Sequence, residues 1–192
     1  TLDLINCLAL DAGNHQICSA VDALSRFYRL SLFGDSDIVS LAEELEHART
    51  YLRIQNMRFG GAIVFDCEVA DNLLALPVMK IILQPLVENA VLHGIREKGS
   101  ESGTIAIRCR LDGDLLIELS DDGVGIEPER LARLFGSERQ APATSEGHGY
   151  GVRNIDERLR LKYGQAYGLE FRSSPGVGTV VTIRIPVDPP GK

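Results

Sequence analysis

Three short motifs in the second half of the chain combine carboxylates, a carboxamide and closely spaced glycines. The first is Glu88-Asn89, which lies in an otherwise apolar run, with His93-Gly94 about one helical turn later. Burying two polar side chains without partners is costly. Glu88 and Asn89 therefore line a polar site, or else they simply lie on the solvated face of a helix.

The second motif is Asp121-Asp122-Gly123-Val124-Gly125, directly after an apolar run typical of a strand. A carboxylate at the end of a strand can accept a hydrogen bond from an exocyclic amine. The two glycines leave room for a flat ring against the backbone. Taken alone, the same string is also that of an ordinary Asp-Gly turn.

The third motif places Gly147, Gly149 and Gly151 at alternate positions, just before a predicted helix. Exposed backbone amides at a helix N-terminus form an anion site that suits a triphosphate. The spacing differs from the dinucleotide-binding G-x-G-x-x-G and from the phosphate loop that ends in Gly-Lys-Ser/Thr. Taken alone, it also fits a flexible lid without a ligand.

The elements that must position these motifs follow from apolar periodicity and from turn residues. A helix is expected from residue 1 to about 33, broken at Gly13-Asn14. A capping box, Ser40 to Glu43, starts a helix that ends at Gly60-Gly61. The later elements are expected as a strand at 63–69, a helix at 77–93 opened by Pro77 and kinked at Pro85, strands at 104–111 and 114–120, helices at 127–135 and 150–163, and strands at 168–173 and 179–185.

This order of elements predicts an α/β fold, a two-layer sandwich with a mixed sheet and helices on one face. Asp112-Gly113 predicts the hairpin between two of the strands. Residues 136–149 are expected to form a mobile loop and residues 188–192 a disordered tail.

Composition narrows the class of protein. The chain has 192 residues, 44% of them hydrophobic, and a formal net charge of -7. These values fit a globular domain and argue against nucleic acid as a partner, because that needs a basic face. No apolar run reaches the ~20 residues that cross a bilayer. The four cysteines, scattered without a C-x-x-C pair, predict free buried thiols in a reducing compartment rather than a zinc site, and they are Cys7, Cys18, Cys67 and Cys109.

Together and in this order, the motifs resemble the N, G1 and G2 boxes of the GHKL ATPase superfamily, and Gly176-Val177-Gly178-Thr179 resembles its closing block. The resemblance covers residues 63–186 and implies the Bergerat ATP-binding fold. Within the superfamily the chain is most similar to sensor histidine kinases of the LytS/YesM type. The strings that carry this likeness begin at Leu41, Ile82 and Gly151.

The resemblance implies a division of the chain. Residues 1–59 would be the remnant of a helical dimerisation and phosphotransfer region, and residues 60–187 the ATP-binding catalytic domain. The phosphoacceptor histidine would lie just upstream of Thr1, because the first residues look like those that follow the family's acceptor segment. The longer parent would be a homodimer anchored in the bacterial inner membrane, with this part in the cytoplasm and a response regulator as partner.

The resemblance also implies roles for residues, with ATP and Mg²⁺ as cofactors. Asp121 would accept from the adenine amino group, Gly123 and Gly125 would let the ring approach, and Thr179 would assist. Asn89 would hold Mg²⁺, and Glu88 would orient the attacking group or act as base.

The phosphates would lie against Gly147, Gly149 and Gly151. His93 would contact a phosphate or cap the helix end. Asp122 stands where the family often has Asn, which places an extra negative charge near the nucleotide.

Two other functions stay open at this point. One is a different GHKL enzyme, such as an anti-sigma serine kinase or a gyrase-type hydrolase, which would lack the preceding helical pair. The other is a non-enzymatic module in which ATP only sets the conformation.

Overall fold

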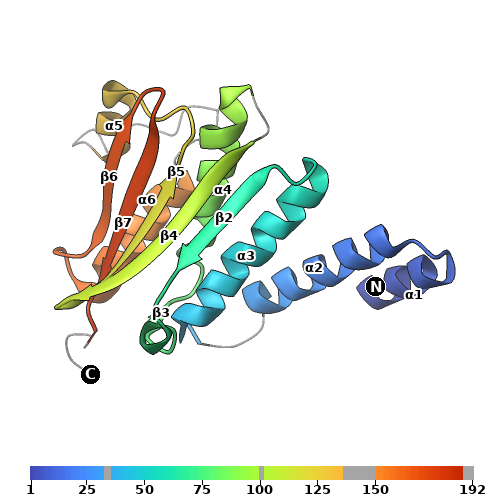
Figure 1. Ribbon diagram of the computed structural model, residues 1–192. Coiled ribbons are helices and arrows are strands. Elements are labelled where there is room, and N and C mark those ends of the chain that lie inside the picture. Colours follow the sequence, from blue (N-terminus) through green and yellow to red (C-terminus); the bar gives the residue numbers. More distant parts are fainter. Residues whose placement is uncertain (33–35, 100–101, 136–149, 188–192) are drawn as a thin grey trace.

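A computed structural model describes residues 1–32, 36–99, 102–135 and 150–187 (Figure 1). Its centre is a five-stranded sheet in the order β2-β4-β5-β7-β6. Strands β2 (Ile63–Glu68) and β4 (Gly103–Asp112) are parallel. The pairings of β4 with β5 (Asp114–Asp121), β5 with β7 (Gly178–Ile185), and β7 with β6 (Gly168–Ser174) are antiparallel. The predicted mixed sheet is confirmed.

Helices cover one face of this sheet, as predicted. Alternate strand residues such as Ile105, Ile117 and Ile183 are fully buried in a single core. That core is completed by α3 (Leu41–Arg58), α4 (Gln84–Asn89) and α6 (Tyr150–Tyr163). In Figure 1, α4 and α6 lie behind the strands and α3 runs beside β2. The short helix α5 (Pro128–Phe135) contacts β6. The result is a two-layer α/β sandwich.

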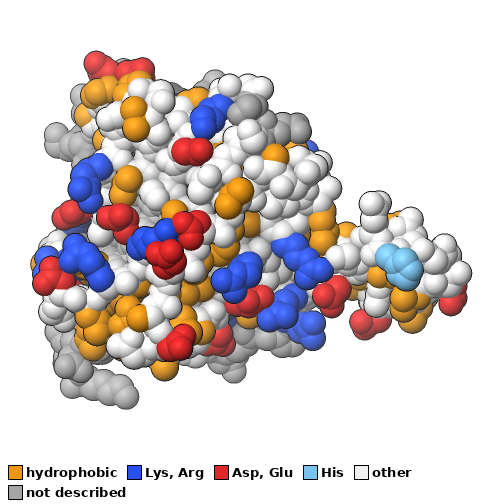
Figure 2. All heavy atoms as spheres, viewed as in Figure 1, with side chains coloured by type: hydrophobic (Ala, Val, Ile, Leu, Met, Phe, Trp, Pro, Cys, Tyr) orange, Lys and Arg blue, Asp and Glu red, His pale blue; other side chains and the backbone are white. Residues whose placement is uncertain are grey.

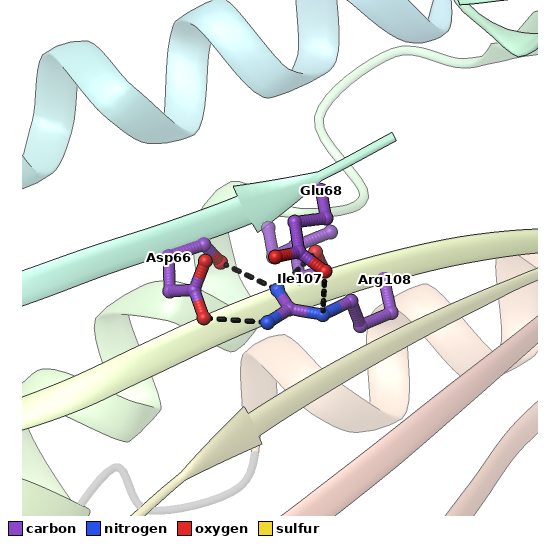
Figure 3. A network of polar contacts seen from close by, with 4 residues as sticks. All are labelled: Asp66, Glu68, Ile107 and Arg108. Atoms are coloured by element: carbon purple, nitrogen blue, oxygen red, sulfur yellow. Dashed lines mark hydrogen bonds and ion pairs between the residues drawn. The ribbon is translucent and has the colours of Figure 1, made fainter. Parts of the chain in front are cut away.

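The opposite face of the sheet is polar. Figure 2 shows acidic and basic side chains interleaved over the strands. At its β2 edge, Arg108 binds the carboxylates of both Asp66 and Glu68, the latter at 3.2 Å (Figure 3). Alternating charge of this kind is typical of a solvated sheet face, which leaves the buried face to hold the site.

The N-terminal helices form a hairpin that extends away from the sandwich (Figure 1). Helix α1 (Leu2–Asp11) and α2 (His15–Leu32) meet at Gly13, whose φ of 64° confirms the predicted break. Among the described residues, none of the helices combines the length and apolarity that a bilayer crossing requires. Several large apolar side chains of the hairpin are exposed, namely Leu4, Ile5, Leu8, Leu10, Ile17, Tyr28 and Leu32.

Helix α3 links this hairpin to the sandwich. The predicted capping box is present, with the Glu43 carboxylate accepting from the Ser40 N–H at 2.8 Å and the Ser40 hydroxyl accepting from the Glu43 N–H at 3.3 Å. The helix ends before Gly60 and Gly61, both with positive φ. Leu41, Leu45 and Leu52 share the core of the sheet. The proposed boundary at residue 59 stays a prediction.

The expected helix at 77–93 is wrong in its first half. Pro77 begins a short strand, β3 (Pro77–Met79), which pairs with β1 (Ile38–Ser40). The helix starts only at Gln84, because Ile81 takes a left-handed conformation with φ of 59°. Pro85 therefore lies in the first turn, where its missing N–H requires no kink. Beyond Asn89 the chain stays helical, as a π-helix at Ala90–Ile95 and a 3₁₀ turn at Arg96–Lys98.

A second correction concerns the cysteines. All four are free, as predicted, but Cys7 is exposed on α1 and the other three are half-buried. Cys7 lies on the exposed surface of α1, whose main contacts among the described residues are with α2. In the parts of the chain that the structure describes, acidic, histidine and cysteine side chains form no cluster of three suited to a metal.

Candidate functional site

A pocket opens between the buried face of the sheet and the helical segment 84–95. Its walls bring together residues from α4, the π-helix, β5, β6, β7 and α6. The lining residues are Leu86, Asn89, Ala90, His93, Gly94, Leu119, Asp121, Gly125, Ile126, Arg130, Val152, Phe171, Thr179 and Val181. Most of these side chains are apolar, so the pocket suits a flat hydrophobic group with a few fixed polar contacts.

Asp121 supplies the carboxylate of this pocket. It is the last residue of β5, and its Oδ1 accepts from the Gly123 N–H at 2.8 Å. Burial raises the pKa of Asp121 to about 6, and the neighbouring Asp122 adds to this, while the N–H groups of Gly123 and Thr179 and the charge of Lys98 act in the opposite direction. A buried carboxylate in an apolar slot is a strong acceptor for an amino group of a ligand.

Glycines allow the chain to close tightly around this carboxylate. A Cβ on Gly94 would lie 2.7 Å from Asp121 Oδ1, and a Cβ on Gly123 would lie 2.3 Å from the Cα of Gly94. At Gly125 the φ is 72° and a Cβ would lie 2.1 Å from the carbonyl oxygen of Ser174. Any other residue would push these segments apart and displace Asp121.

Hydrogen bonds hold the loop after β5 in place. The Val124 N–H donates to the Gly94 carbonyl at 3.0 Å, and the Ile126 N–H donates to the Ser173 hydroxyl at 2.8 Å. Ser173 Oγ also lies 2.9 Å from the Thr179 hydroxyl. Thr179 is thereby positioned within the wall opposite the helix.

The helical wall contributes Asn89 and His93, one turn apart. Both line the pocket. His93 Nδ1 lies 3.1 Å from Glu97 Oε1, and the chain remains helical to Lys98, so His93 is not the last helical residue. Glu88 does not line the pocket. It is half-buried. Burial raises the pKa of the Tyr51 phenol of α3, and the charge of Glu88 adds to this rise.

The glycine motif is only partly described. Gly147 and Gly149 lie outside the described residues. Gly151 is the second residue of α6, and a Cβ there would lie 3.5 Å from the Cβ of Pro85, so the start of α6 stands beside the start of α4. The sequence prediction that this helix N-terminus approaches the site is consistent with that contact, and the phosphate role stays a prediction.

Asp122 is turned away from the pocket. Its Oδ1 accepts from the Thr104 N–H at 2.9 Å and lies 3.5 Å from Lys98 Nζ. The negative charge expected near a ligand is therefore paired at the edge of β4, and it adds to the effect of burial in raising the pKa of Asp121.

Several wall residues were missed by the sequence reading. Leu86, Ala90, Ile126, Val152 and Phe171 are apolar, so their sequence pattern is that of ordinary core residues. Arg130 was missed as well, although its position just before the glycine-rich segment was a usable signal.

The pocket can hold a planar heterocycle with an exocyclic amine on Asp121 and its ring beside Gly125. Gly123, which was predicted to let the ring approach, does not line the pocket and packs against Gly94 instead. Asn89 would then lie toward the substituents of that heterocycle. Magnesium is usually bound by one or two protein oxygens together with phosphate oxygens and water. The single amide oxygen of Asn89 in the pocket wall fits such an ion better than a cage of carboxylates would.

Comparison with known proteins agrees with this geometry. The profile of the family described as histidine kinase-, DNA gyrase B-, and HSP90-like ATPase matches residues 78–189, and a profile described as histidine kinase matches residues 1–63. The sensor histidine kinase BtsS of Escherichia coli K12 is 30% identical over 174 residues, which are 90% of this chain and 28% of that protein. The sensor histidine kinase YesM of Bacillus subtilis is 32% identical over 187 residues, 97% and 30% respectively.

This chain thus spans less than a third of the length of those two relatives. Solved structures of the same fold include the histidine kinase domain from a blue-light activated histidine kinase of Erythrobacter litoralis, with a TM-score of 0.54 and 19% identity over 97% of this chain and 82% of that one. The catalytic domain of histidine kinase ThkA has a TM-score of 0.58 and 18% identity, over 79% of this chain and 95% of that one.

Proposed function

The chain belongs to the family of histidine kinase-, DNA gyrase B- and HSP90-like ATPases, and on that premise we propose that it is the ATP-binding catalytic part of a two-component sensor histidine kinase. The observation that carries the proposal is the buried Asp121 carboxylate in an apolar slot, with Asn89 on the facing helical wall. The histidine kinase profile over residues 1–63 supports the kinase over other members of the family.

In this function Asp121 accepts a hydrogen bond from the adenine amino group. Gly125 lets the ring lie against the backbone, Gly123 lets the loop close against Gly94, and Thr179 supports the carboxylate side of the pocket. Asn89 holds Mg²⁺ through its amide oxygen, and the bound ion would neutralise charge on the phosphates. Gly147, Gly149 and Gly151 cradle the phosphates, with His93 as a further phosphate contact.

The γ-phosphoryl group passes from ATP to an imidazole nitrogen, so that a P–N bond forms and the P–O bond to ADP breaks. Such transfers depend on position and charge more than on covalent help. Glu88 lies on the α3 side of its helix, outside the nucleotide pocket. From there it can orient the incoming imidazole or take up its proton.

The phosphoacceptor is a histidine on a segment preceding residue 1. His47 does not suit this role because it is 2% exposed and its ring stacks on Phe27. The phosphoryl group would then move to an aspartate of a response regulator. The parent protein would be a homodimer through the apolar face of the α1–α2 hairpin, anchored in the bacterial inner membrane with this part in the cytoplasm.

The test is phosphotransfer from ATP labelled at the γ-phosphate, in a protein that includes the preceding segment. We expect acid-labile, alkali-stable label on histidine that is lost in Asn89→Ala. Exposed Asn72→Ala, in the 3₁₀ turn at Asp71–Leu73 and outside the pocket, serves as the matched control and should keep the label. ATP binding without label on any histidine would contradict the kinase and favour a module that only senses ATP. Label on serine would favour the serine kinase.

A further inference from the structure

A buried glutamate joins the helix that receives the N-terminal hairpin to the helix that carries Asn89. Glu44 of α3 is 2% exposed, and its carboxylate accepts the backbone N–H groups of Ile81, Ile82 at 2.8 Å and Leu83 at 3.0 Å. We propose that Glu44 is a positioning residue that sets the place of α4, and through it the place of Asn89 at the nucleotide. The proposal rests on the role of Asn89 in the proposed function.

Helix α4 has no side chain of its own at the N-cap that could accept a hydrogen bond. The first N–H groups of a helix need acceptors, which a side chain at the N-cap usually supplies. Here the N-cap is Leu83, whose side chain has no acceptor, and the residue after Gln84 is a proline. Glu44, 37 to 39 positions earlier in the chain, accepts instead from the N–H groups of the three residues that lead into the helix, Ile81, Ile82 and the N-cap Leu83.

The same turn is held in an unfavourable conformation. Ile81 has φ of 59°, a region that β-branched residues avoid because the side chain collides with the backbone. It is the only residue other than glycine with positive φ in the described parts of the chain. Such a conformation persists only where surrounding contacts enforce it. The carboxylate of Glu44 bonds the N–H of this very residue.

Arg158 of helix α6 binds the backbone carbonyl groups of the same turn. Arg158 Nη2 donates to the Lys80 carbonyl at 2.9 Å, and Nη1 donates to the Ile81 carbonyl at 3.4 Å. Burial raises the pKa of the Glu44 carboxyl, while the N–H groups of the turn and the charge of Arg158 favour its ionised form. The turn is therefore fixed between α3 and the helix that follows the glycine-rich segment.

A shift of this turn would move one side of the pocket only. Asn89 lies six residues after Leu83, roughly 9 Å along a helix axis, and moves with the helix start. Asp121 and Gly123 belong to β5 and the loop after it, and the pairing of β5 with both β4 and β7 fixes them. Their contact with Gly94 lies farther from the turn than Asn89 does. Loss of Glu44 should therefore weaken the metal–phosphate part of binding and spare the adenine part.

The experiment compares two probes on the chain of residues 1–192. Glu44→Gln keeps the shape but removes the charge and one acceptor. We expect its affinity for ATP with magnesium to fall by at least ~10-fold, in the range of a lost charge-assisted contact. Adenosine, which lacks phosphates, should bind within about twofold of wild type. Hydrogen exchange of the Ile81–Leu83 amides should become faster.

A second change tests the cause. Glycine adopts positive φ without strain, so Ile81→Gly should reduce the need for Glu44. The double variant Glu44→Gln/Ile81→Gly should recover most of the magnesium-ATP affinity that Glu44→Gln loses. A Glu44 that served only overall stability would give no such recovery. If Glu44→Gln folds poorly, Arg158→Lys, which removes one of the donors to the same turn, replaces it in the same comparison.

The outcomes separate the two proposals. Equal loss of adenosine and magnesium-ATP affinity, unchanged magnesium-ATP affinity, or absence of recovery by Ile81→Gly would overturn the positioning role. A wild-type chain that binds neither probe would instead overturn the proposed function. In that case exchange of the α4 amides in Glu44→Gln still decides whether Glu44 sets the helix, because that measurement uses no nucleotide.

Discussion

The carboxylate of Asp121 and the backbone N–H of Gly123 are joined by a hydrogen bond of 2.8 Å. This bond orients the carboxylate within the pocket, and Gly94 closes behind it so tightly that a Cβ there would meet Asp121 Oδ1 at 2.7 Å. A buried acceptor is thus fixed before any ligand arrives, and such preorganisation favours recognition of an amino group.

Replacing Asp121 by asparagine should weaken ATP binding without loss of fold. The amide can still accept from Gly123, but its NH₂ group would then face the adenine amino group, donor against donor. We expect a loss of roughly 1.5–3 kcal/mol, about 10- to 150-fold in Kd, by calorimetry. Asp122→Asn is the matched control, since Asp122 is turned toward Thr104 and Lys98 and should leave affinity nearly unchanged. Equal effects of the two variants would count against the pocket assignment.

The raised pKa of Asp121 predicts how stability depends on pH without nucleotide. Its pKa of about 6 in the folded state lies above the ordinary value of 3.8. Between these pH values the folded protein retains a proton that the unfolded chain has lost. The contribution of Asp121 to the free energy of unfolding therefore falls as pH rises from about 4 to about 6, and is then constant.

Asp121→Asn removes this contribution and provides the measurement. We would measure the free energy of unfolding of both proteins in urea from pH 4.5 to 8, a range that includes the pKa of about 6. As pH rises, the free energy of unfolding of the variant should increase relative to that of wild type. The difference should reach at most about 3 kcal/mol above pH 6. If the free energies of unfolding of the two proteins changed in parallel with pH, the pKa of Asp121 would be ordinary and its carboxyl less buried than in the structure.

The glycines of the pocket can be tested by a pair of alanine substitutions with the same backbone angle. Gly125 and Gly113 have φ of 72° and 71°, but a Cβ on Gly125 would lie 2.1 Å from the Ser174 carbonyl, whereas one on Gly113 would meet no described atom within 4 Å. Gly113→Ala should cost about 1 kcal/mol from the left-handed conformation alone. Gly125→Ala should lower the free energy of unfolding by distinctly more and should also weaken ATP binding. Equal losses of free energy of unfolding in the two variants would show that the loop around Gly125 can move to make room for a side chain.

Local signals explain which elements could be predicted from the sequence. The Ser40 capping box, the Gly60-Gly61 stop and the Asp112-Gly113 hairpin depend on residues a few positions apart, and all three are present. Pro77 was misread because its strand exists only through pairing with Ser40, and because the turn after it is held by Glu44. Contacts across 37 positions leave no local trace in the sequence.

The residues of the site likewise fall into those that local motifs could predict and those that they could not. The order of the motifs predicted that Asn89, Asp121 and Gly125 would meet, and the structure brings all three to one pocket. The apolar walls could not be predicted, because Ile126, Val152 and Phe171 have the pattern of core residues whether or not a ligand lies against them. Nor could the exposure of Cys7, which depends on what packs beside α1.

The apolar surface of the N-terminal hairpin gives the last prediction. Leu4 and Leu8 of α1 are 63% and 60% exposed, and Leu32 at the end of α2 is 72% exposed. A surface of this kind is typical of a helix that packs on another copy. In a twofold dimer each substitution acts twice, because the same patch is present on both partners.

Leu8→Glu should therefore raise the dimer dissociation constant by at least ~10-fold, since burying one leucine contributes roughly 1.5–3 kcal/mol. Sedimentation equilibrium over a range of concentrations measures this directly. The control is Leu161→Glu on α6, where an equally apolar side chain is 84% exposed but lies away from the hairpin. It should leave the dissociation constant unchanged. Equal weakening by both variants, or a wild-type chain that stays monomeric at every concentration, would mean that the hairpin does not form the dimer contact.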